Sequence, residues 1–332
     1  MRLPPLVRLA LWPLSILYGD ITQVRVWLYE KGIFRVTKLQ RPVISVGNLT
    51  VGGTGKTPMV IWLAERLLAE GKCVGILSRG YKGRGGTSDE IELMKSRLPR
   101  RVLFGVGSNR YEQGKKLESS VDVFLLDDAF QHLQLGRDVN ILLVDAAQHL
   151  TKQTMLPTGC LREPISAMTR ADVLVFTRTD TVPGTTAAVD RFQEYPVFSA
   201  ATRLLGFRRL GNQAQLLPAE DLGAGPFYAF CGIGNPSAFF QDLKNWGIPL
   251  ADRCEFPDHH RYDVRDTSEL QAAARSAGAK AFITTEKDAQ NLAGITVGDF
   301  PVYAAAIDLQ IGKETALLEF IHQKLEVGKL VA

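Results

Sequence analysis

A glycine-rich stretch that contains a lysine and a threonine, Gly52-Gly53-Thr54-Gly55-Lys56-Thr57, follows an apolar run at residues 43–46. A strand that ends in such a turn and continues into a helix binds phosphate, because backbone N–H groups and the positive helix end face one anion. Lys56 would reach the β- and γ-phosphates of a nucleotide, and the Thr57 hydroxyl would hold Mg²⁺. The strict pattern has glycine where this chain has Thr50. The stretch still favours a nucleoside triphosphate site over a glycine-rich turn without a ligand. The predicted nucleotide-binding residues are Thr50, Val51, Gly52, Gly53, Thr54, Gly55, Lys56 and Thr57.

Two adjacent aspartates, Asp127 and Asp128, close the apolar run at residues 121–126. A hydrophobic strand that ends in aspartate beside a phosphate loop is typical of the second Mg²⁺ ligand in nucleotide hydrolases and kinases. Because neighbouring carboxylates repel, a cation is needed to keep both ionised. We therefore predict a metal site of Thr57, Asp127 and Asp128, with a solvated turn as the alternative. His132 would share a helical face with Asp128 if residues 129–134 form a helix, although a surface histidine is nearly as compatible.

Other charged clusters follow predicted strands. The basic loop at residues 78–84 suits an anionic group or the transferring phosphoryl group, and equally suits a solvated loop. Arg162 could contact phosphate and Glu163 could orient it, although a surface turn is the simpler interpretation. At residues 256–262 a histidine follows an aspartate, and such a histidine can act as a base near neutral pH. A pair of histidines in a polar loop is, however, more often a surface feature. Residues 285–288 could be a helix N-cap with no further role.

Length and composition limit the class of protein. The 332 residues are enough for two domains, and 45% hydrophobic with 22% charged residues is ordinary for a globular chain. The net charge of +4 comes without a basic stripe interleaved with aromatics, so we expect no nucleic-acid partner. The four cysteines are scattered, which indicates reduced thiols in a cytosolic protein and no zinc site.

The first 40 residues combine apolar, aromatic and basic side chains. Pro4, Pro5, Arg8 and Pro13 interrupt the apolar stretch at residues 1–18, so it is too short to span a membrane. No small-residue cleavage site follows it, which argues against a signal peptide. A helix lying on an anionic membrane surface and a helix packed on its own domain are both compatible with the pattern.

From residue 43 to 200, short β-branched runs alternate with helical stretches. This alternation predicts a mostly parallel sheet with helices on both faces, resembling P-loop NTPases, with ligands at the carboxyl ends of the strands. Residues 203–210 and 213–217 flank Gly211-Asn212 and predict an antiparallel hairpin, which we expect to be a β-ribbon linker to a smaller α/β domain. The predicted organisation is a membrane-contacting helical segment (1–40), a P-loop domain (41–202), the hairpin linker (203–218) and a C-terminal α/β domain (219–332).

Several motifs in one order resemble the tetraacyldisaccharide 4′-kinase (lipid A 4′-kinase) family of P-loop kinases. Besides residues 47–58, they are Ser78-Arg79-Gly80-Tyr81, Leu126-Asp127-Asp128-Ala129-Phe130-Gln131-His132, Leu161-Arg162-Glu163-Pro164, Asp258-His259 with Tyr262, and Thr285-Glu286-Lys287-Asp288. The series runs from about residue 43 to 290 and is more specific than any one motif. The apolar N-terminal segment is likewise similar to the family's membrane-contacting helices.

The resemblance implies ATP- and Mg²⁺-dependent phosphorylation of the 4′-hydroxyl of a tetraacyldisaccharide 1-phosphate, a step of lipid A (lipopolysaccharide) biosynthesis. It implies a peripheral location on the cytoplasmic face of the bacterial inner membrane, a lipid disaccharide substrate and no protein partner. By motif, Lys56, Asp89 and His259 are the expected catalytic residues, the last two as a pair. The expected residues of the substrate cleft are Arg79, Tyr81, Glu90, Arg110, His132, Arg162 and Glu163.

The chain departs from the family before Asp89. The family usually has a longer insertion there and a Gly-Asp-Glu-Pro element, whereas this chain reads Ser88-Asp89-Glu90-Ile91. Either the insertion is lost or Asp89 is not the matching acid.

Two other classes of function share some of these features. A nucleotide-dependent switch or chaperone ATPase would hydrolyse ATP or GTP regardless of lipid. A membrane-surface binding module would keep its function after Lys56→Ala. The ordered motifs favour the kinase over both.

Overall fold

The computed structural model describes residues 4–80, 88–148, 150–180, 192, 194–223, 225–292, 295 and 297–330. The chain forms two compact units. The first unit comprises Met1–Thr87, Leu98–Ala201 and Leu309–Ala332, and the second unit comprises Ser88–Arg97 and Thr202–Asp308. These units divide the chain differently from the predicted segments. Residues 88–97 belong to the second unit and residues from 309 onward to the first, while the predicted N-terminal segment and hairpin linker are parts of the first and second unit, respectively. Contacts distant in the sequence decide both assignments.

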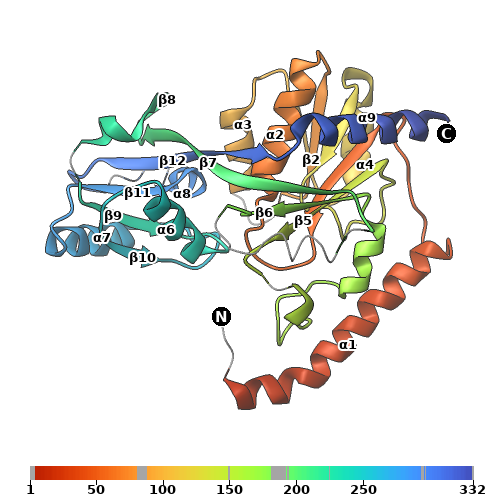
Figure 1. The fold of residues 1–332 in the computed structure, drawn as a ribbon, viewed down its shortest axis with the longest axis horizontal. Helices are drawn as coiled ribbons and strands as arrows, with labels where there is room; N and C mark the ends of the chain where they lie inside the picture. Colours follow the sequence, from red (N-terminus) through yellow and green to blue (C-terminus); the bar gives the residue numbers. More distant parts are fainter. Residues whose placement is uncertain are drawn as a thin grey trace. The chain divides into compact units, whose positions relative to one another are not determined.

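The first unit contains the predicted parallel sheet. Its strands are β1 (Val43–Asn48), β2 (Val74–Ser78), β3 (Leu103–Val106), β4 (Val123–Leu126), β5 (Val139–Asp145), β6 (Val173–Thr177) and the start of β7 (Val197–Arg209). The strand order is β7-β6-β5-β1-β4-β2-β3, and every pair is parallel (Figure 1). All residues of β1, β2, β4 and β6 are buried, as continuous apolar strands of a covered sheet require.

The described residues of the first unit also form several helices. They are α1 (Pro5–Glu30), α2 (Lys56–Ala69), α4 (Arg110–Leu117) and α9 (Glu314–Leu330), with short 3-10 turns at Glu118–Ser120, Leu150–Lys152 and Ile165–Arg170. Helix α2 contacts β1, β2 and β4, and α9 contacts β5. The ion pair between Arg66 of α2 and Glu314 of α9, with Nε–Oε1 at 2.6 Å, helps to hold the C-terminal helix on this unit.

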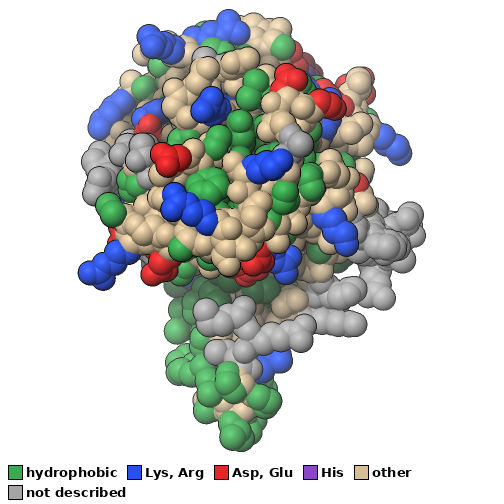
Figure 2. Space-filling view, turned by 90° about the vertical axis from the view of Figure 1, so that its left-hand side faces the viewer, with side chains coloured by type: hydrophobic (Ala, Val, Ile, Leu, Met, Phe, Trp, Pro, Cys, Tyr) green, Lys and Arg blue, Asp and Glu red, His purple; other side chains and the backbone are tan. Residues whose placement is uncertain are grey.

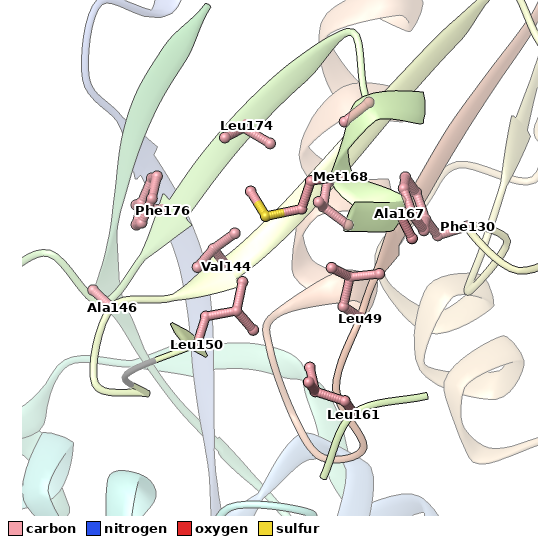
Figure 3. Packing of buried hydrophobic residues seen from close by; sticks show 12 residues of the cluster. Leu49, Phe130, Val144, Ala146, Leu150, Leu161, Ala167, Met168, Leu174 and Phe176 are labelled. Atoms are coloured by element: carbon pink, nitrogen blue, oxygen red, sulfur yellow. The ribbon is translucent and has the colours of Figure 1, made fainter. Parts of the chain in front are cut away.

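A hydrophobic cluster lies where three loops of the first unit meet. Leu49 follows β1, Phe130 follows β4, and Leu161 comes from a later loop; all three pack with residues of β5 and β6 (Figure 3). Gly47 is required there, because a Cβ atom would lie 2.6 Å from the backbone nitrogen of Phe130. The cluster therefore brings the turn after β4 against the start of the glycine-rich loop.

The turn after β4 corrects one prediction. Residues 129–134 form turns and no helix, so His132 does not share a helical face with Asp128. The His132 backbone N–H donates to the Ala129 carbonyl, and Arg137 donates to the carbonyls of Ala129 and Phe130. Because these carbonyls bind other donors and Phe130 is buried, the backbone follows a path that differs from a helix.

The second unit has its own parallel sheet. Its strands are β9 (Phe227–Cys231), β10 (Leu250–Glu255), β11 (Ala281–Thr285) and β12 (Val302–Ile311), in the order β10-β9-β11-β12, with β7 beside β12. The predicted hairpin is present, because β8 (Asn212–Leu217) pairs antiparallel with β7. The helices are α3 (Asp89–Arg97), α6 (Pro236–Asn245), α7 (Val264–Ser276) and α8 (Glu286–Asn291), with a 3-10 turn at Ala219–Leu222. The sequence did not predict β10, α3 or α6.

An aromatic cluster seats the loop at residues 256–262 in the second unit. Phe230 of β9 makes edge-on contacts with Phe256, Tyr262 and Phe282, at centroid distances of 6.5, 5.5 and 5.7 Å. Phe256 also stacks on the His260 ring at 4.6 Å. Such ring contacts stabilise one loop conformation in addition to the apolar area that they bury.

Helix α1 is one continuous helix that includes Pro13. It rests on the first unit at few points: the Ser15 hydroxyl lies 2.8 Å from the Thr158 hydroxyl, and Arg25 donates to the Gln131 carbonyl. Its large apolar side chains are mostly exposed, with Leu6 at 81% and Leu9 at 71%, and they gather over this helix in Figure 2. Among the described residues, no helix has the length and apolar character needed to cross a membrane.

Candidate active site

The phosphate loop (residues 52–57) lies between β1 and α2, as predicted. Gly52 and Gly55 have φ of 114° and 86°, which favour glycine, and Gly55 is the N-cap of α2. The first turn of α2 contains no acidic residue. An anion at this helix end would meet backbone N–H groups and the positive end of the helix dipole without a competing carboxylate.

The Lys56 side chain is held between two oxygen-bearing side chains. Its Nζ lies 3.7 Å from Asp128 Oδ1 and 3.3 Å from Asn48 Oδ1, and the side chain is only 14% exposed. Asn48, at the end of β1, is fully buried and donates through Nδ2 to the Thr50 carbonyl. Gln131 donates to the Asn48 carbonyl at 2.9 Å. The loop and Lys56 are thus anchored before any ligand binds.

Asp128 is the electrostatic centre of this region. Arg162 Nη1 lies 2.9 Å from both carboxylate oxygens of Asp128, and Lys56 faces the same group. Burial raises the pKa of Asp128, but Lys56, Arg162 and Arg110 together lower it below its ordinary value, so the carboxylate stays ionised. The backbone of Asp128 has φ of 44°, and Arg110 stabilises this turn by donating to the carbonyls of Asp127 and Asp128 at 2.8 and 3.4 Å.

Arg162 reaches Asp128 because its segment pairs with the loop after β1. The Val51 N–H donates to the Cys160 carbonyl at 2.8 Å, and the Arg162 N–H donates to the Leu49 carbonyl at 2.7 Å. Glu163 is 2% exposed and forms an ion pair with Arg170. Glu163 therefore stabilises the segment through its ion pair with Arg170, whereas Arg162 binds the carboxylate of Asp128.

The three residues of the predicted magnesium site all belong to the first unit. Asp127 and Asp128 follow β4, and the Thr57 hydroxyl opens α2. A hydroxyl and two carboxylates, one of them shown to favour ionisation, are the hard donors that Mg²⁺ prefers. The residues fit the ion that the sequence predicts.

The other predicted cleft residues differ in their surroundings. Arg110 is 4% exposed and binds backbone carbonyls, and Arg79 at the end of β2 is exposed. Burial and nearby arginines, of which Arg110 contributes most, lower the pKa of His132 to about 4, so it is neutral at pH 7. Tyr81 lies outside the described residues.

Asp89 and His259 are in direct contact in the second unit. His259 Nδ1 lies 3.1 and 3.0 Å from Asp89 Oδ1 and Oδ2, although 170 residues separate the two. Asp89 opens α3 and is 6% exposed, and His259 has φ of 61°. The contact supports the alignment of Asp89 despite the short segment before it.

A buried carboxyl, Asp288, supports the loop that carries His259. Its Oδ1 accepts from the Gly232 N–H and the Tyr262 hydroxyl, both at 2.8 Å, and its Oδ2 accepts from the Thr285 hydroxyl at 2.6 Å. Thr285 is the N-cap of α8, as predicted. The His259 N–H in turn donates to the Gly232 carbonyl. The Tyr262 and Asp288 motifs therefore meet at one hydrogen-bonded centre.

Charges around the Asp89/His259 pair shift its titration. Burial raises the pKa of Asp89, but the hydrogen bond from His259 and other contacts lower it strongly, so Asp89 is ionised at neutral pH. Burial and the neighbouring Asp89 raise the pKa of Glu90. The hydrogen bond to Asp89 raises the pKa of His259. Asp89, Glu90 and His259 are close enough to share a metal ion, but Lys287 already supplies positive charge there, so we assign them none.

Some residues of these sites were not in the predicted set. Asn48, Gln131, Arg170, Asp258 and Lys287 all contact predicted residues. Asn48 could have been found from its position at the carboxyl end of β1. Asp258 and Lys287 belong to motifs of the resemblance, but only the tertiary contacts bring Lys287 to Asp89 and Asp258.

Comparison with known proteins gives one consistent result. The model of the family described as "Tetraacyldisaccharide-1-P 4'-kinase" matches residues 7–326. The chain is similar to the tetraacyldisaccharide 4′-kinase of Geobacter metallireducens, with 40% identity over 321 residues, covering 90% of this chain and 92% of that protein. It is 36% identical over 342 residues to that of Desulfatibacillum aliphaticivorans, covering 95% and 92%.

A solved structure agrees with these relatives. The crystal structure of LpxK from Aquifex aeolicus in complex with ATP superposes with a TM-score of 0.75 at 33% identity, covering 96% of this chain and 99% of that chain. The match covers enough of the chain to include both units. The chain therefore belongs to the tetraacyldisaccharide-1-phosphate 4′-kinase family, a family of phosphotransferases.

Proposed function

We propose that this protein transfers the γ-phosphate of ATP to the 4′-hydroxyl of a tetraacyldisaccharide 1-phosphate in lipid A biosynthesis. The phosphate loop carries this proposal, because its Lys56 is positioned by Asn48 and Asp128 beside a helix end free of acidic residues. Family membership supplies the acceptor: relatives that this chain matches over about nine-tenths of its length are named for that lipid. No observation favours a nucleotide switch or chaperone.

ATP is the proposed donor and Mg²⁺ the proposed metal. Backbone N–H groups of residues 52–57 and the Lys56 ammonium would bind the β- and γ-phosphates. Thr57, Asp127 and Asp128 would hold Mg²⁺, which, when bound, neutralises charge on the phosphate oxygens. Arg162 pairs with Asp128 in the structure, and its guanidinium carries the charge that would suit a phosphate oxygen of ATP.

The Asp89/His259 pair would take the proton of the attacking hydroxyl. A sugar hydroxyl is a weak nucleophile, but phosphoryl transfer is loose, so most of the barrier falls through positioning and charge neutralisation. Asp89 is ionised and bound to His259, so the pair can accept one proton and spread the resulting charge over both groups. The Asp89 contact raises the pKa of His259, which makes the imidazole a stronger base.

A transfer assay tests the proposal. Radiolabelled γ-phosphate should appear on tetraacyldisaccharide 1-phosphate with wild-type protein and Mg²⁺, and removal of Mg²⁺ with EDTA should stop it. Without lipid, release of phosphate should be negligible. Hydrolysis that proceeds at the same rate with and without lipid, and no labelled lipid, would instead support a switch or chaperone.

We further propose that α1 binds the surface of the bacterial inner membrane from the cytoplasmic side. Its exposed apolar residues, such as Leu9 and Trp12, lie on the same helix as the exposed Arg8, a combination that suits anionic lipid surfaces. Wild-type protein should sediment with vesicles that contain anionic lipid, and Leu9→Ser/Trp12→Ser should weaken this binding while transfer to detergent-dispersed lipid remains. Unchanged sedimentation of the variant would refute the role of α1.

A further inference from the structure

Lys287 lies in the middle of a charged cluster in the second unit. From the first turn of α8, its Nζ lies 3.5 Å from Asp89 Oδ2, 3.4 Å from Glu90 Oε1 and 3.2 Å from Asp258 Oδ1. The side chain is only 18% exposed. The ammonium group has three N–H donors, and three carboxyl groups surround it: two from α3 and one from the loop that carries His259.

His259 faces the same three carboxyl groups from another side. Its Nδ1 binds Asp89, and its Nε2 lies 3.6 Å from Glu90 Oε1 and 3.8 Å from Asp258 Oδ2. Lys287 and His259 therefore share one set of acids. Without the lysine, His259 would be the only basic side chain known to contact them among the described residues.

The backbone of α8 holds Lys287 in place through the residues on both sides of it. Glu286 binds Arg97, at the other end of α3, with Oε2–Nη1 at 2.7 Å, and Arg208 of β7 at 3.3 Å. Asp288 is the buried centre that binds Gly232 and Tyr262. Three consecutive residues of α8 thus bind both ends of α3 and support the loop that carries His259.

We propose that Lys287 is a positioning residue of the Asp89/His259 pair: its ammonium fixes the three surrounding carboxyl groups and shares their charge with the imidazole. The proposal rests on the proposed role of that pair in phosphoryl transfer. Because Lys287 binds the carboxyl groups, the imidazole does not have to stay protonated to balance them. It then loses its proton at a lower pH than it would without the lysine, and so can take part in accepting another.

The electrostatics agree with this geometry. The hydrogen bond with Asp89 raises the pKa of His259, and Glu90 raises it further, whereas burial and the Lys287 charge lower it. Besides Asp258 of its own loop, the charged groups known to face His259 come from α3 and α8, and they are Asp89, Glu90 and Lys287. Removing the lysine leaves the acids and removes the opposing charge, so the pair should keep its proton to higher pH.

The test is the pH dependence of kcat/KM, which reports the free enzyme, for Lys287→Met. We expect the ascending limb to move up by about one pH unit, the scale of one charge at this distance. At pH values below that limb, kcat/KM of Lys287→Met should be about tenfold lower than that of the wild type, and at higher pH it should return to the wild-type value. Lys287→Arg should restore the wild-type limb, and Lys280→Met, at an exposed lysine of the same unit, should leave it unchanged.

A second variant covers the case in which Lys287→Met does not fold. Glu90→Gln removes one of the acids, so its limb should move to lower pH, and Lys287→Met/Glu90→Gln should lie between the two single variants. The imidazole titration of His259, followed by NMR and assigned with His259→Asn, should move in the same directions. This NMR readout does not depend on turnover.

The outcomes separate this inference from the proposed roles of the pair. If Asp89→Asn and His259→Asn retain wild-type transfer, the proposed roles are wrong and the inference falls with them. If those variants lose transfer but Lys287→Met shows an unchanged limb and an unchanged His259 titration, Lys287 has no positioning role. A loss that is equal at every pH would also overturn it, because that loss would be structural.

Discussion

The phosphate loop and the Asp89/His259 pair are built in opposite ways. The first is one contiguous stretch between β1 and α2, with Lys56 and its partner Asn48 eight residues apart. The second joins residues 170 positions apart, because residues 88–97 leave the first unit's part of the chain and fold into the second unit. The strand, loop and helix of the first site are neighbours in the sequence, whereas the pair exists only when the second unit is folded.

The difference teaches that binding of nucleotide and activation of the acceptor can be disturbed separately. Around Lys56, positive and negative groups balance within the first unit, through Asp128 and Arg162. Around His259, the balance is set within the second unit, through Lys287 and three carboxyl groups. Each balance can therefore be changed by substitutions that leave the other unit intact.

The largest effect is expected in the first unit. Lys56→Ala should lower phosphate transfer about 1000-fold and also weaken ATP binding, because it removes the cation beside the γ-phosphate. Transfer is measured with radiolabelled ATP, and binding by calorimetry. Lys72→Ala, an exposed lysine after α2, is the matched control. Normal ATP binding by Lys56→Ala would break the assignment of the loop.

Asp89→Asn should reduce kcat about 100-fold or more, the scale of general acid–base catalysis, while ATP binding stays as in the wild type. The reason is that the amide cannot accept a proton and lies in the other unit from the phosphate loop. Transfer with radiolabelled ATP and ATP binding by calorimetry check this expectation, with Asp252→Asn of β10 as an exposed control. A parallel loss of ATP affinity would show that the two sites are not separable.

Asp89→Asn should also lower the pKa of His259. Its carboxylate is the group that raises this pKa most, and burial and Lys287 act in the opposite direction. The expected fall is about one unit or more, so a larger share of the imidazole is neutral at pH 7 in the variant. Histidine side-chain NMR over a pH series measures it; an unchanged or higher value would mean that the contact does not control the proton.

The smallest effect concerns stability of the second unit. Tyr262→Phe removes one of the donors to the buried Asp288, which should cost about 1–3 kcal/mol of unfolding free energy. Urea unfolding followed by near-UV circular dichroism measures the loss, and Tyr303→Phe on β12 is a half-buried control. ATP binding should be unaffected. A variant as stable as the wild type would show that Asp288 does not depend on this hydroxyl.

Much of the fold and part of the site could be predicted from the sequence. The parallel strands of the first unit, the phosphate loop, the Thr285 N-cap and the hairpin of β7 with β8 were predicted correctly. Each of these features depends on residues that are close in the sequence, such as an apolar run or a glycine whose backbone conformation other residues rarely adopt. The helix conditionally placed at residues 129–134 was wrong, since the buried Phe130 and the donors of Arg137 decide that backbone.

By itself, the sequence determined the elements that short-range patterns specify, and the order of its motifs named the family. The family motifs had paired Asp89 with His259, but only the tertiary structure decided the geometry of their contact, the place of Lys287 beside their carboxyl neighbours, and the assignment of residues 88–97 to the second unit. The physical reason is that backbone propensity and periodicity act over a few residues, whereas charge balance and burial depend on which distant segments pack together.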